Sequence, residues 1–362
     1  MSATSDFRPG LEGVIAFETE IAEPDKDGGS LRYRGVDIEE LVGSYPFENV
    51  WGLLVDEDLG SPLPPAEKIE LQDPSGSVPA DLQAGLATLG PKWGLQQLVD
   101  IEDGQARNDL ARLSAATLSI VAQAARGKQP AVPDTVIDTG ENAAAQFLIR
   151  WRGEADPRAV KALDTYWVSA AEHGLNASTF TARIAASTGA DCAAALSSAV
   201  GTLSGRLHGG APAHVLPMLD AVAASGDAEG YVEEVLAGGD RIMGFGHRVY
   251  RAEDPRARVL RRTAVELGSP RVEVALALER AALEALRAKS PDRVLETNVE
   301  YWAAVVLDIA EIPPALAPAM FACARVAGWS AHILEQKRTG RLIRPGARYI
   351  GPPPRSVADV AR

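Results

Sequence analysis

The chain has 362 residues, of which 46% are hydrophobic and 23% are charged, as in an ordinary globular protein with a large core. This length favours two domains. The formal net charge of −13 and a pI near 5.0 argue against broad binding of nucleic acid or of an anionic membrane, because both need a positive field over a whole face. Small anionic ligands remain compatible with this charge, since a local group of arginines can hold them inside an acidic protein.

Secreted and membrane-spanning proteins are two further classes that the sequence disfavours. The N-terminal region shows no basic segment followed by an apolar core, so we expect no secretory signal. No run of about 18 apolar residues occurs, so we expect no membrane span. Cys192 and Cys323 lack CxxC spacing, which predicts two buried thiols rather than a disulfide framework or a zinc site, and a cytoplasmic location.

In chain order, the predicted elements begin with a small β region. The stretch LEGVIAFETEIAEPDKDGGSLRYRGVDIEEL, residues 11–41, predicts two or three short strands, a turn at 27–29 and a helix that begins near Asp37. Proline-rich stretches at 61–65, 129–133 and 352–354 predict loops or tails. Elsewhere Ala, Leu, Arg and Glu recur with helical period, so the predicted fold class is mainly α with a small N-terminal β element.

Two of the predicted helices have clear ends. Asp254 is the expected N-cap of one helix, with Pro255 at its first position and Gly268 just past its end. The following helix is expected to have Ser269 as its N-cap and Pro270 at its first position, and to end before Pro291.

Histidines are scarce, and three of the five stand beside glycines that break helices. His208 lies in SGRLHGGAPAH, His247 lies in GFGHRVYR, and His173 lies between a helical segment and GLNASTFTAR. Glycine lets the backbone bend and approach a ligand, so this pattern predicts a site. His208 and His214 share no helical face and no HExxH or Cys/His cluster occurs, so no metal site is predicted. The chain also lacks a dinucleotide-binding fingerprint, a GxxxxGK[ST] loop and a GxSxG elbow.

Seven arginines and no lysine lie between residues 241 and 262. A guanidinium can bind a carboxylate or a phosphate through two parallel hydrogen bonds, so this bias predicts an anion site. Arg256 falls in the first turn of a predicted helix, where free backbone N–H groups also attract anions. We expect Arg258, Arg261 and Arg262 to form only a solvated, ion-paired helix face. A second basic cluster in the C-terminal tail consists of Arg338, Arg341, Arg344 and Arg348.

The stretch MGFGHRVYRAEDPRAR, residues 243–258, resembles the signature of the citrate synthase family. The stretches EHGLNASTFTARIAASTGAD, LSGRLHGGAPAHVLPML, FACARVAGWSAHILEQ and RLIRPGARYIG also resemble family segments and occur in the family's order. The match is dense from 172 to 351 and thin from 51 to 147. The resemblance implies a nearly all-α homodimer with two domains. The large domain, residues 1–212 and 322–362, would form the dimer interface, and the small domain, residues 213–321, would close over the substrates.

The resemblance also implies an acyltransferase that condenses oxaloacetate with acetyl-CoA and hydrolyses citryl-CoA to citrate and CoA, at the entry to the tricarboxylic acid cycle. It implies no cofactor beyond these substrates. His208 would hydrogen-bond the thioester carbonyl, His247 would polarise the ketone of oxaloacetate, and Glu300 would stand at the position of the catalytic base. Oxaloacetate would be held by His173, His247, Arg256 and Arg325, together with Arg344 of the other subunit. Arg251 would bind a phosphate of CoA.

Glu300 departs from the family pattern. The family base is an aspartate in a PNVDF-like segment, whereas this chain reads ETNVEYW. The extra methylene moves a carboxylate by roughly 1 Å unless the backbone compensates, and such a shift can lower a rate about 10²-fold. Either Glu300 is the base on an adapted backbone, which is the interpretation we favour, or the chain is an attenuated paralogue. Asp308, two helical turns further on, is a less attractive candidate.

Two other functions stay open. A 2-methylcitrate synthase performs the same chemistry on propionyl-CoA, and a single methylene in an acyl pocket changes binding by only about 1–3 kcal/mol. The second alternative belongs to another functional class, a non-catalytic protein that binds CoA or a dicarboxylate as a sensor.

Overall fold

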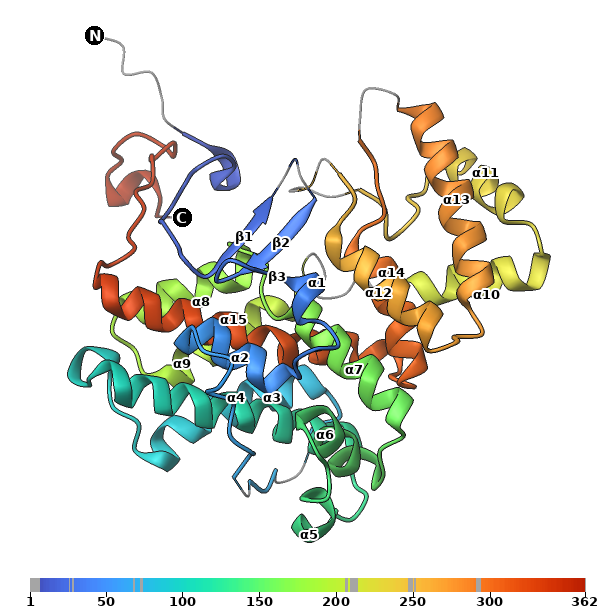
Figure 1. The fold of residues 1–362 in the computed structure, drawn as a ribbon. Coiled ribbons are helices and arrows are strands. Elements are labelled where there is room, and N and C mark those ends of the chain that lie inside the picture. Colours follow the sequence, from blue (N-terminus) through green and yellow to red (C-terminus); the bar gives the residue numbers. More distant parts are fainter. Residues whose placement is uncertain are drawn as a thin grey trace.

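The computed structural model describes residues 7–25, 27, 29–67, 69–71, 74–205, 208, 214–246, 250, 252–290 and 294–361. Across these residues the chain is mainly helical, which confirms the predicted fold class (Figure 1). The helices are α1 (Ile38–Leu41), α2 (Phe47–Asp56), α3 (Val78–Trp93), α4 (Asp103–Arg126), α5 (Asp134–Ile137), α6 (Ala143–Arg152), α7 (Pro157–Ala170), α8 (Ala177–Ser187), α9 (Cys192–Leu203), α10 (Val215–Ser225), α11 (Ala228–Ala237), α12 (Pro255–Glu266), α13 (Val272–Lys289), α14 (Val299–Ile309) and α15 (Ala317–Thr339).

The predicted β region near the N-terminus forms one antiparallel sheet in the order β1-β2-β3. Its strands are β1 (Ala22–Asp25), β2 (Ser30–Tyr33) and β3 (Val36–Asp37). The helix expected near Asp37 is α1, and Asp37 caps it, because its carboxylate accepts the backbone N–H of Glu39. Tyr33 is fully buried, and its hydroxyl donates toward the carbonyl oxygen of Glu172 at 3.1 Å. The sheet is thereby attached to the segment that follows α7.

The predicted boundaries of α12 are confirmed. The helix begins directly after its N-cap, Asp254, and Gly268 follows its end with a φ of +63°, a left-handed conformation that favours glycine. α13 begins at Val272, later than predicted, because the hydroxyl of Ser269 accepts the N–H of Arg271 in a turn ahead of the helix.

The arginine face of α12 is ion-paired as predicted, partly with a helix far away in the sequence. Arg258 and Arg262 bind Glu39 of α1 at 2.6 and 3.2 Å, and Arg261 binds Glu253 at 2.5 Å. All three guanidinium side chains keep a third or more of their surface exposed. These arginines therefore attach α12 to the N-terminal region and lie outside the site described below.

The helices form two groups that α7 connects (Figure 1). In the first group, α2, α3, α4, α8 and α9 pack on α15, and α6 packs on α2 and α4. The second group consists of α10 to α14, in which α12 packs on α14 and α13 packs on α10 and α11. α7 packs on α2, α6 and α15 of the first group and also on α12 and α14 of the second. The C-terminal end of α7 therefore lies where residues of both groups can meet.

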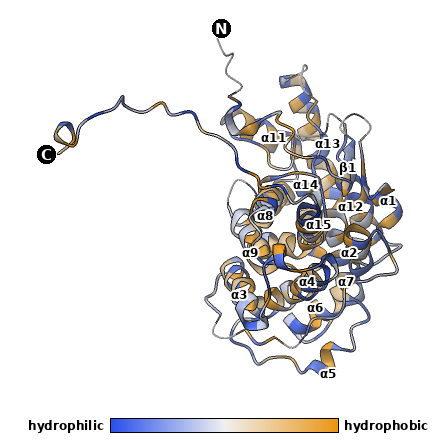
Figure 2. Cartoon of the chain, turned by 90° about the vertical axis from the view of Figure 1, so that its left-hand side faces the viewer, coloured by the Kyte–Doolittle hydropathy of each residue, from blue (hydrophilic) through white to orange (hydrophobic). Residues whose placement is uncertain are grey.

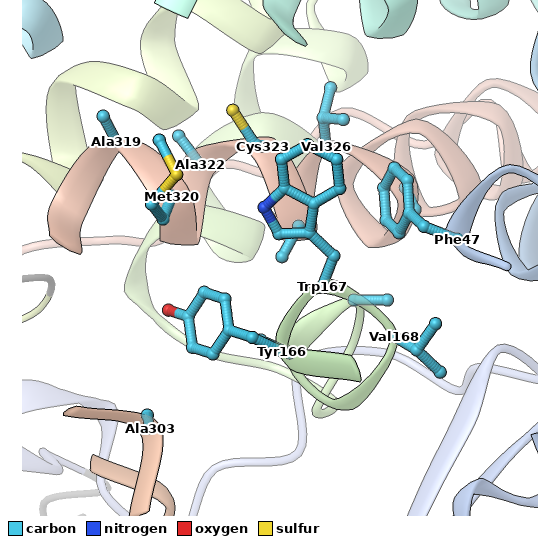
Figure 3. Close-up of a cluster of buried hydrophobic side chains, with 14 of the residues drawn as sticks. Phe47, Tyr166, Trp167, Val168, Ala303, Ala319, Met320, Ala322, Cys323 and Val326 are labelled. Atoms are coloured by element: carbon cyan, nitrogen blue, oxygen red, sulfur yellow. The ribbon is translucent and has the colours of Figure 1, made fainter. Parts of the chain in front are cut away.

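The core of the first group is built around α15, which is buried along most of its length. Trp167 of α7 packs between Phe47 of α2 and the side of α15 that carries Cys323 and Val326 (Figure 3). The ring centroids of Trp167 and Phe47 lie 5.4 Å apart. Cys192 and Cys323 are both buried and free, as predicted. A helix enclosed on all sides needs no polar face, which explains the weak amphipathic pattern of α15.

After α15 the chain leaves the body of the molecule as an extended C-terminal arm, residues 340–361 (Figure 2). The predicted proline-rich tail at 352–354 lies in this arm. Several apolar side chains of the arm are exposed, namely Leu342, Tyr349, Ile350, Val357 and Val360. The arm touches its own chain near its base, where the N–H of Ile343 donates to the hydroxyl of Ser187 at 3.1 Å.

Candidate active site

A cavity of about 190 Å³ lies between the two helix groups, bordered by α7, α12, α14 and α15. Five of the residues predicted to form a site line it, namely His173, His208, Arg256, Glu300 and Arg325. Its other lining residues are Tyr166, Ala170, Asn176, Asn298, Val299, Ala303 and Phe321. The structure thus brings together side chains from five separate parts of the sequence.

Three predicted site residues are not placed at this cavity. His247 and Arg251 lie outside the described residues. Arg344 lies in the exposed C-terminal arm and does not line the cavity of its own chain (Figure 2).

Arg256 is held by the N-cap residue of its own helix. Its Nε and Nη2 atoms donate to the two carboxylate oxygens of Asp254 at 3.0 and 2.8 Å, and both side chains are almost fully buried. Asp254 Oδ2 also accepts the N–H of Val299 at 3.1 Å, which joins the start of α12 to the start of α14. Burial opposes the charge of Arg256, but the Asp254 carboxylate outweighs it and raises the pKa of the arginine. Arg256 is therefore a fixed cation in the cavity wall.

Arg325 of α15 supplies a second guanidinium to the same cavity. It is buried, its Nε donates to the carbonyl oxygen of Ala170 at 2.9 Å, and its Cζ lies 4.7 Å from the ring centre of Phe321. Burial lowers the pKa of Arg325, the Glu172 carboxylate opposes this effect, and the nearby charge of Arg256 adds to it. Two buried guanidiniums that face one space make that space suited to an anion with more than one acidic group.

His208 contacts side chains of α8 and of the α15 start. Its Nε2 lies 2.8 Å from the hydroxyl oxygen of Ser178, and that oxygen also accepts the indole N–H of Trp329 at 3.2 Å. The imidazole is edge-on to the ring of Phe321, with centroids 6.1 Å apart. Burial, with a smaller contribution from the charge of Arg325, lowers the pKa of His208 to about 4. A neutral imidazole results at pH 7, and it can donate a hydrogen bond without carrying charge into the cavity.

His173 lies between α7 and α8, at the helix break that the sequence predicts. Gly174 beside it has a φ of +65°, which lets the chain turn there without strain. The Nε2 of His173 lies 2.9 Å from the hydroxyl of Tyr250, and the two rings are edge to face. On the other side, the buried carboxylate of Glu172 lies 3.3 Å from Nε2 of His332 in α15. This turn is therefore anchored from two directions.

Glu300 lies in the first turn of α14. Asn298 caps this helix, and its side-chain oxygen accepts the N–H of Glu300 at 3.0 Å. Within the described part of the chain, the Glu300 carboxylate has no hydrogen bond and no ion pair, and it lines the cavity. Burial raises the pKa of Glu300, the positive charge of Arg256 opposes this, and the Asp254 carboxylate adds to it. An unpaired carboxylate of raised basicity beside a cavity has the properties of a general base.

Asp308, the less attractive candidate for that role, is engaged elsewhere. It lies near the other end of α14, where its Oδ2 accepts a hydrogen bond from Nε of Arg271 at 2.8 Å, and it does not line the cavity.

Several residues at the cavity escaped prediction from the sequence. Asn298 had a usable signal, because an asparagine ahead of an apolar helical run is a typical N-cap. Tyr166 and Phe321 had none, since an aromatic residue in an apolar helix segment more often indicates core packing. Ser178, which contacts His208 without lining the cavity, had none either, because this contact exists only in the folded chain.

The described residues form neither a metal-binding cluster nor a membrane-spanning helix. No group of three or more His, Cys, Asp or Glu side chains there is arranged to hold a metal ion. In the same part of the chain, each helix is too short or too polar to span a bilayer.

The family model described as citrate synthase, C-terminal domain, matches residues 10–346 of this chain. The chain belongs to the citrate synthase family. A Mycobacterium tuberculosis protein named "Putative citrate synthase 2" is 63% identical over 357 residues, which cover 98% of this chain and 96% of the relative. The citrate synthase of a Synechocystis species is 36% identical, covering 97% of this chain and 92% of the relative. The 2-methylcitrate synthase of Shewanella oneidensis is 32% identical, covering 97% of both chains.

Solved structures of the family share the fold. The citrate synthase of Thermoplasma acidophilum, in a ternary complex with carboxymethyl-CoA and oxaloacetate, aligns with a TM-score of 0.83 at 25% identity, covering 98% of this chain and 100% of that chain. The enzyme of Pyrobaculum aerophilum aligns with a TM-score of 0.79 at 28% identity, covering 96% and 93%. Members of the citrate synthase family are acyltransferases that convert the acyl group to an alkyl group on transfer, and the present chain is an enzyme of this type.

Proposed function

We propose that this enzyme condenses oxaloacetate with acetyl-CoA and then hydrolyses citryl-CoA to citrate and CoA, at the entry to the tricarboxylic acid cycle. The observation that carries the proposal is the cavity in which two buried guanidiniums, a neutral imidazole and an unpaired carboxylate meet. The ternary complex of the Thermoplasma acidophilum citrate synthase supports the choice of substrates.

In this proposal, Arg256 and Arg325 bind the carboxylates of oxaloacetate. Both cations are buried before any ligand arrives, so the dianion meets fixed charges rather than flexible, hydrated side chains. His173, which lines the same cavity, adds a hydrogen bond to the substrate. His247 polarises the ketone and Arg251 binds a CoA phosphate. These last two roles rest on the resemblance of the motif.

Glu300 removes a proton from the thioester methyl group. That proton is very weakly acidic, so the step needs both a base of raised pKa and a donor to the enolate oxygen that forms. Burial makes Glu300 a stronger base than an exposed glutamate. Neutral His208 donates a hydrogen bond to the thioester oxygen, where negative charge develops. The methyl carbon then attacks the ketone carbon of oxaloacetate, and water hydrolyses the resulting thioester.

Glu300 serves as the base in place of the family's aspartate. Support comes from its position, because its carboxylate borders the cavity and no described residue binds it. The start of α14 is also fixed by the Asn298 cap and by the bond from Val299 to Asp254, so the carboxylate is presented from a rigid backbone.

Propionyl-CoA is the competing acyl substrate. Its support is the 32% identity to the 2-methylcitrate synthase of Shewanella oneidensis. The two thioesters differ by one methyl group, so we expect a preference rather than exclusion.

A homodimer completes the proposed site. The arm that carries Arg344 extends away from the body of the molecule (Figure 2). It exposes the apolar side chains of Leu342, Tyr349 and Ile350, which a second subunit would cover. Arg344 then reaches the site of the other subunit. We place residues 1–212 and 322–362 in the large domain and residues 213–321 in the small one, supported by the packing of α10 to α14 on one another. A cytoplasmic location stays a prediction.

Release of CoA thiol from acetyl-CoA and from propionyl-CoA, with and without oxaloacetate, tests the function. We expect oxaloacetate-dependent release and a higher kcat/KM with acetyl-CoA. A higher kcat/KM with propionyl-CoA would make the enzyme a 2-methylcitrate synthase. No release with either thioester, together with measurable binding of oxaloacetate, would leave the non-catalytic sensor.

A further inference from the structure

The hydroxyl of Tyr166 is unusual among the buried tyrosines of the described chain. Tyr166 lies near the C-terminal end of α7 and is only 3% exposed. Tyr33, Tyr250 and Tyr301 are buried as well, and each has a hydrogen bond at its hydroxyl. For the Tyr166 hydroxyl the described residues supply no partner, although buried tyrosine hydroxyls usually have one.

The Tyr166 side chain points away from the core that its neighbour enters. Figure 3 shows Trp167 directed toward Phe47 and α15, whereas the oxygen of Tyr166 points away from Trp167. Tyr166 and Ala303 both line the cavity that holds the candidate active site. The hydroxyl oxygen is not fully enclosed by protein atoms. It therefore borders free space. A ligand in the cavity is therefore within its reach.

The charges around Tyr166 indicate what kind of ligand atom it would meet. The side chains that act on it electrostatically include Arg325, Glu300 and Arg256, all of which line the same cavity. Burial is the main cause that raises the pKa of Tyr166, so the phenol keeps its proton at neutral pH and acts as a donor. A donor placed beside two guanidiniums is complementary to a carboxylate that those guanidiniums attract.

Glu300 is the other acceptor near this hydroxyl, but no bond joins the two side chains in the structure. A bond to Tyr166 would also weaken Glu300 as a base, because a donor to the carboxylate favours its charged form and lowers its pKa. The substrate is therefore the acceptor that leaves the base free.

We propose that Tyr166 is a further substrate-binding residue, whose hydroxyl donates a hydrogen bond to a carboxylate oxygen of the dicarboxylate held by Arg256 and Arg325. This inference rests on the proposed function, since it needs oxaloacetate in the cavity. The Tyr166 hydroxyl adds a neutral donor to the two guanidiniums. The site then selects a ligand both by its negative charge and by the position of a hydrogen-bond acceptor.

Tyr166→Phe removes only the oxygen and keeps the aromatic ring of this α7 residue. A hydrogen bond to a charged group corresponds to roughly a 10- to 100-fold change in affinity, so we expect the Kd and the KM for oxaloacetate to rise by about that factor. The KM for acetyl-CoA should stay within about twofold. Tyr301→Phe is the matched control, because that hydroxyl donates to the carbonyl of Ala275 at 2.7 Å, outside the cavity.

The melting temperature separates substrate binding from a structural role. Without ligand, Tyr166→Phe should melt at the same temperature as the wild type or higher, because it loses a hydroxyl to which no described residue bonds. Tyr301→Phe should melt lower and keep its affinity for oxaloacetate. The upward shift that oxaloacetate causes in the melting temperature should shrink in Tyr166→Phe.

Two results overturn the inference, and they differ in what else they affect. If the wild type binds oxaloacetate and Tyr166→Phe binds it equally well, Tyr166 has no binding role and the proposed function is untouched. If the wild type itself does not bind oxaloacetate, both the inference and the proposed function fail. Should Tyr166→Phe not fold, Tyr166→Met gives the same comparison with a different apolar side chain.

Discussion

Replacement of Glu300 by glutamine tests the assignment of the base most directly. Glutamine has nearly the same shape but cannot accept the methyl proton. General base catalysis contributes about 10²- to 10⁴-fold, so we expect Glu300→Gln to lower kcat by a factor in that range. Arg256 and Arg325 are untouched, and the loss of a negative charge beside them should leave the Kd for oxaloacetate unchanged or slightly lower.

Replacement of Glu300 by aspartate tests the geometry. Aspartate lacks one methylene, which withdraws the carboxylate by about 1.5 Å, the length of one C–C bond. The α14 start cannot follow easily, because Asn298 caps it and Asp254 holds the N–H of Val299. A displacement of about 1 Å can lower a rate about 10²-fold, so we expect Glu300→Asp to lose roughly that factor in kcat although aspartate is equally able to act as a base.

Both variants are measured by oxaloacetate-dependent release of CoA thiol at saturating acetyl-CoA, with the Kd for oxaloacetate determined separately by calorimetry. Wild-type kcat in Glu300→Gln would remove Glu300 from the mechanism. A kcat in Glu300→Asp above that of the wild type would show that the backbone is still shaped for aspartate, and it would identify the chain as an attenuated paralogue.

Three other predictions concern separate groups. His208→Ala should lower kcat about 10²- to 10³-fold with little change in oxaloacetate Kd, because it removes the donor to the enolate oxygen; an unaltered kcat in steady-state assays would contradict this. Burial raises the pKa of Asp164 to about 7, from an ordinary value of 3.8. The folded state therefore holds this proton more tightly than the unfolded state, so its stabilisation is complete below about pH 4 and is lost as the pH rises through about 7. Asp164→Asn keeps an oxygen for the N–H of Phe47 and should raise the melting temperature at about pH 8 but little at about pH 4; equal shifts at both would refute the assignment. Arg344→Ala and Glu300→Gln should each have a strongly lowered kcat alone, but dimers refolded from their mixture should regain activity, because one site then holds both native side chains; no recovery would argue against a shared site.

Local signals in the sequence predicted much of the fold. The Asp254-Pro255 start of α12, the glycine after its end and the helix near Asp37 are properties of a few adjacent residues, and all three are confirmed. The start of α13 was placed too early, because a serine–proline pair resembles an N-cap. In the structure the Ser269 hydroxyl instead accepts the N–H of Arg271, within a turn that precedes the helix.

Motif positions also predicted which chemical groups gather at the cavity, but not how they are held. The pairing of Arg256 with Asp254 could be suspected from their spacing. Its link to α14 through Val299 could not, since 45 residues separate the two ends of that bond. The lowered pKa of His208 likewise depends on burial by side chains from other helices.

The sequence by itself determined the helical class, the Asp254 cap, the small N-terminal sheet and the membership of the citrate synthase family, because each of these depends on side-chain type and local spacing. Only the tertiary structure decided that Tyr166 faces the cavity while Trp167 enters the core (Figure 3). It also decided that no described residue pairs with the Glu300 carboxylate and that Asp308 is bound to Arg271. The reason is physical. Burial, pairing and direction are properties of the space between helices, and that space exists only once α7, α12, α14 and α15 have packed together.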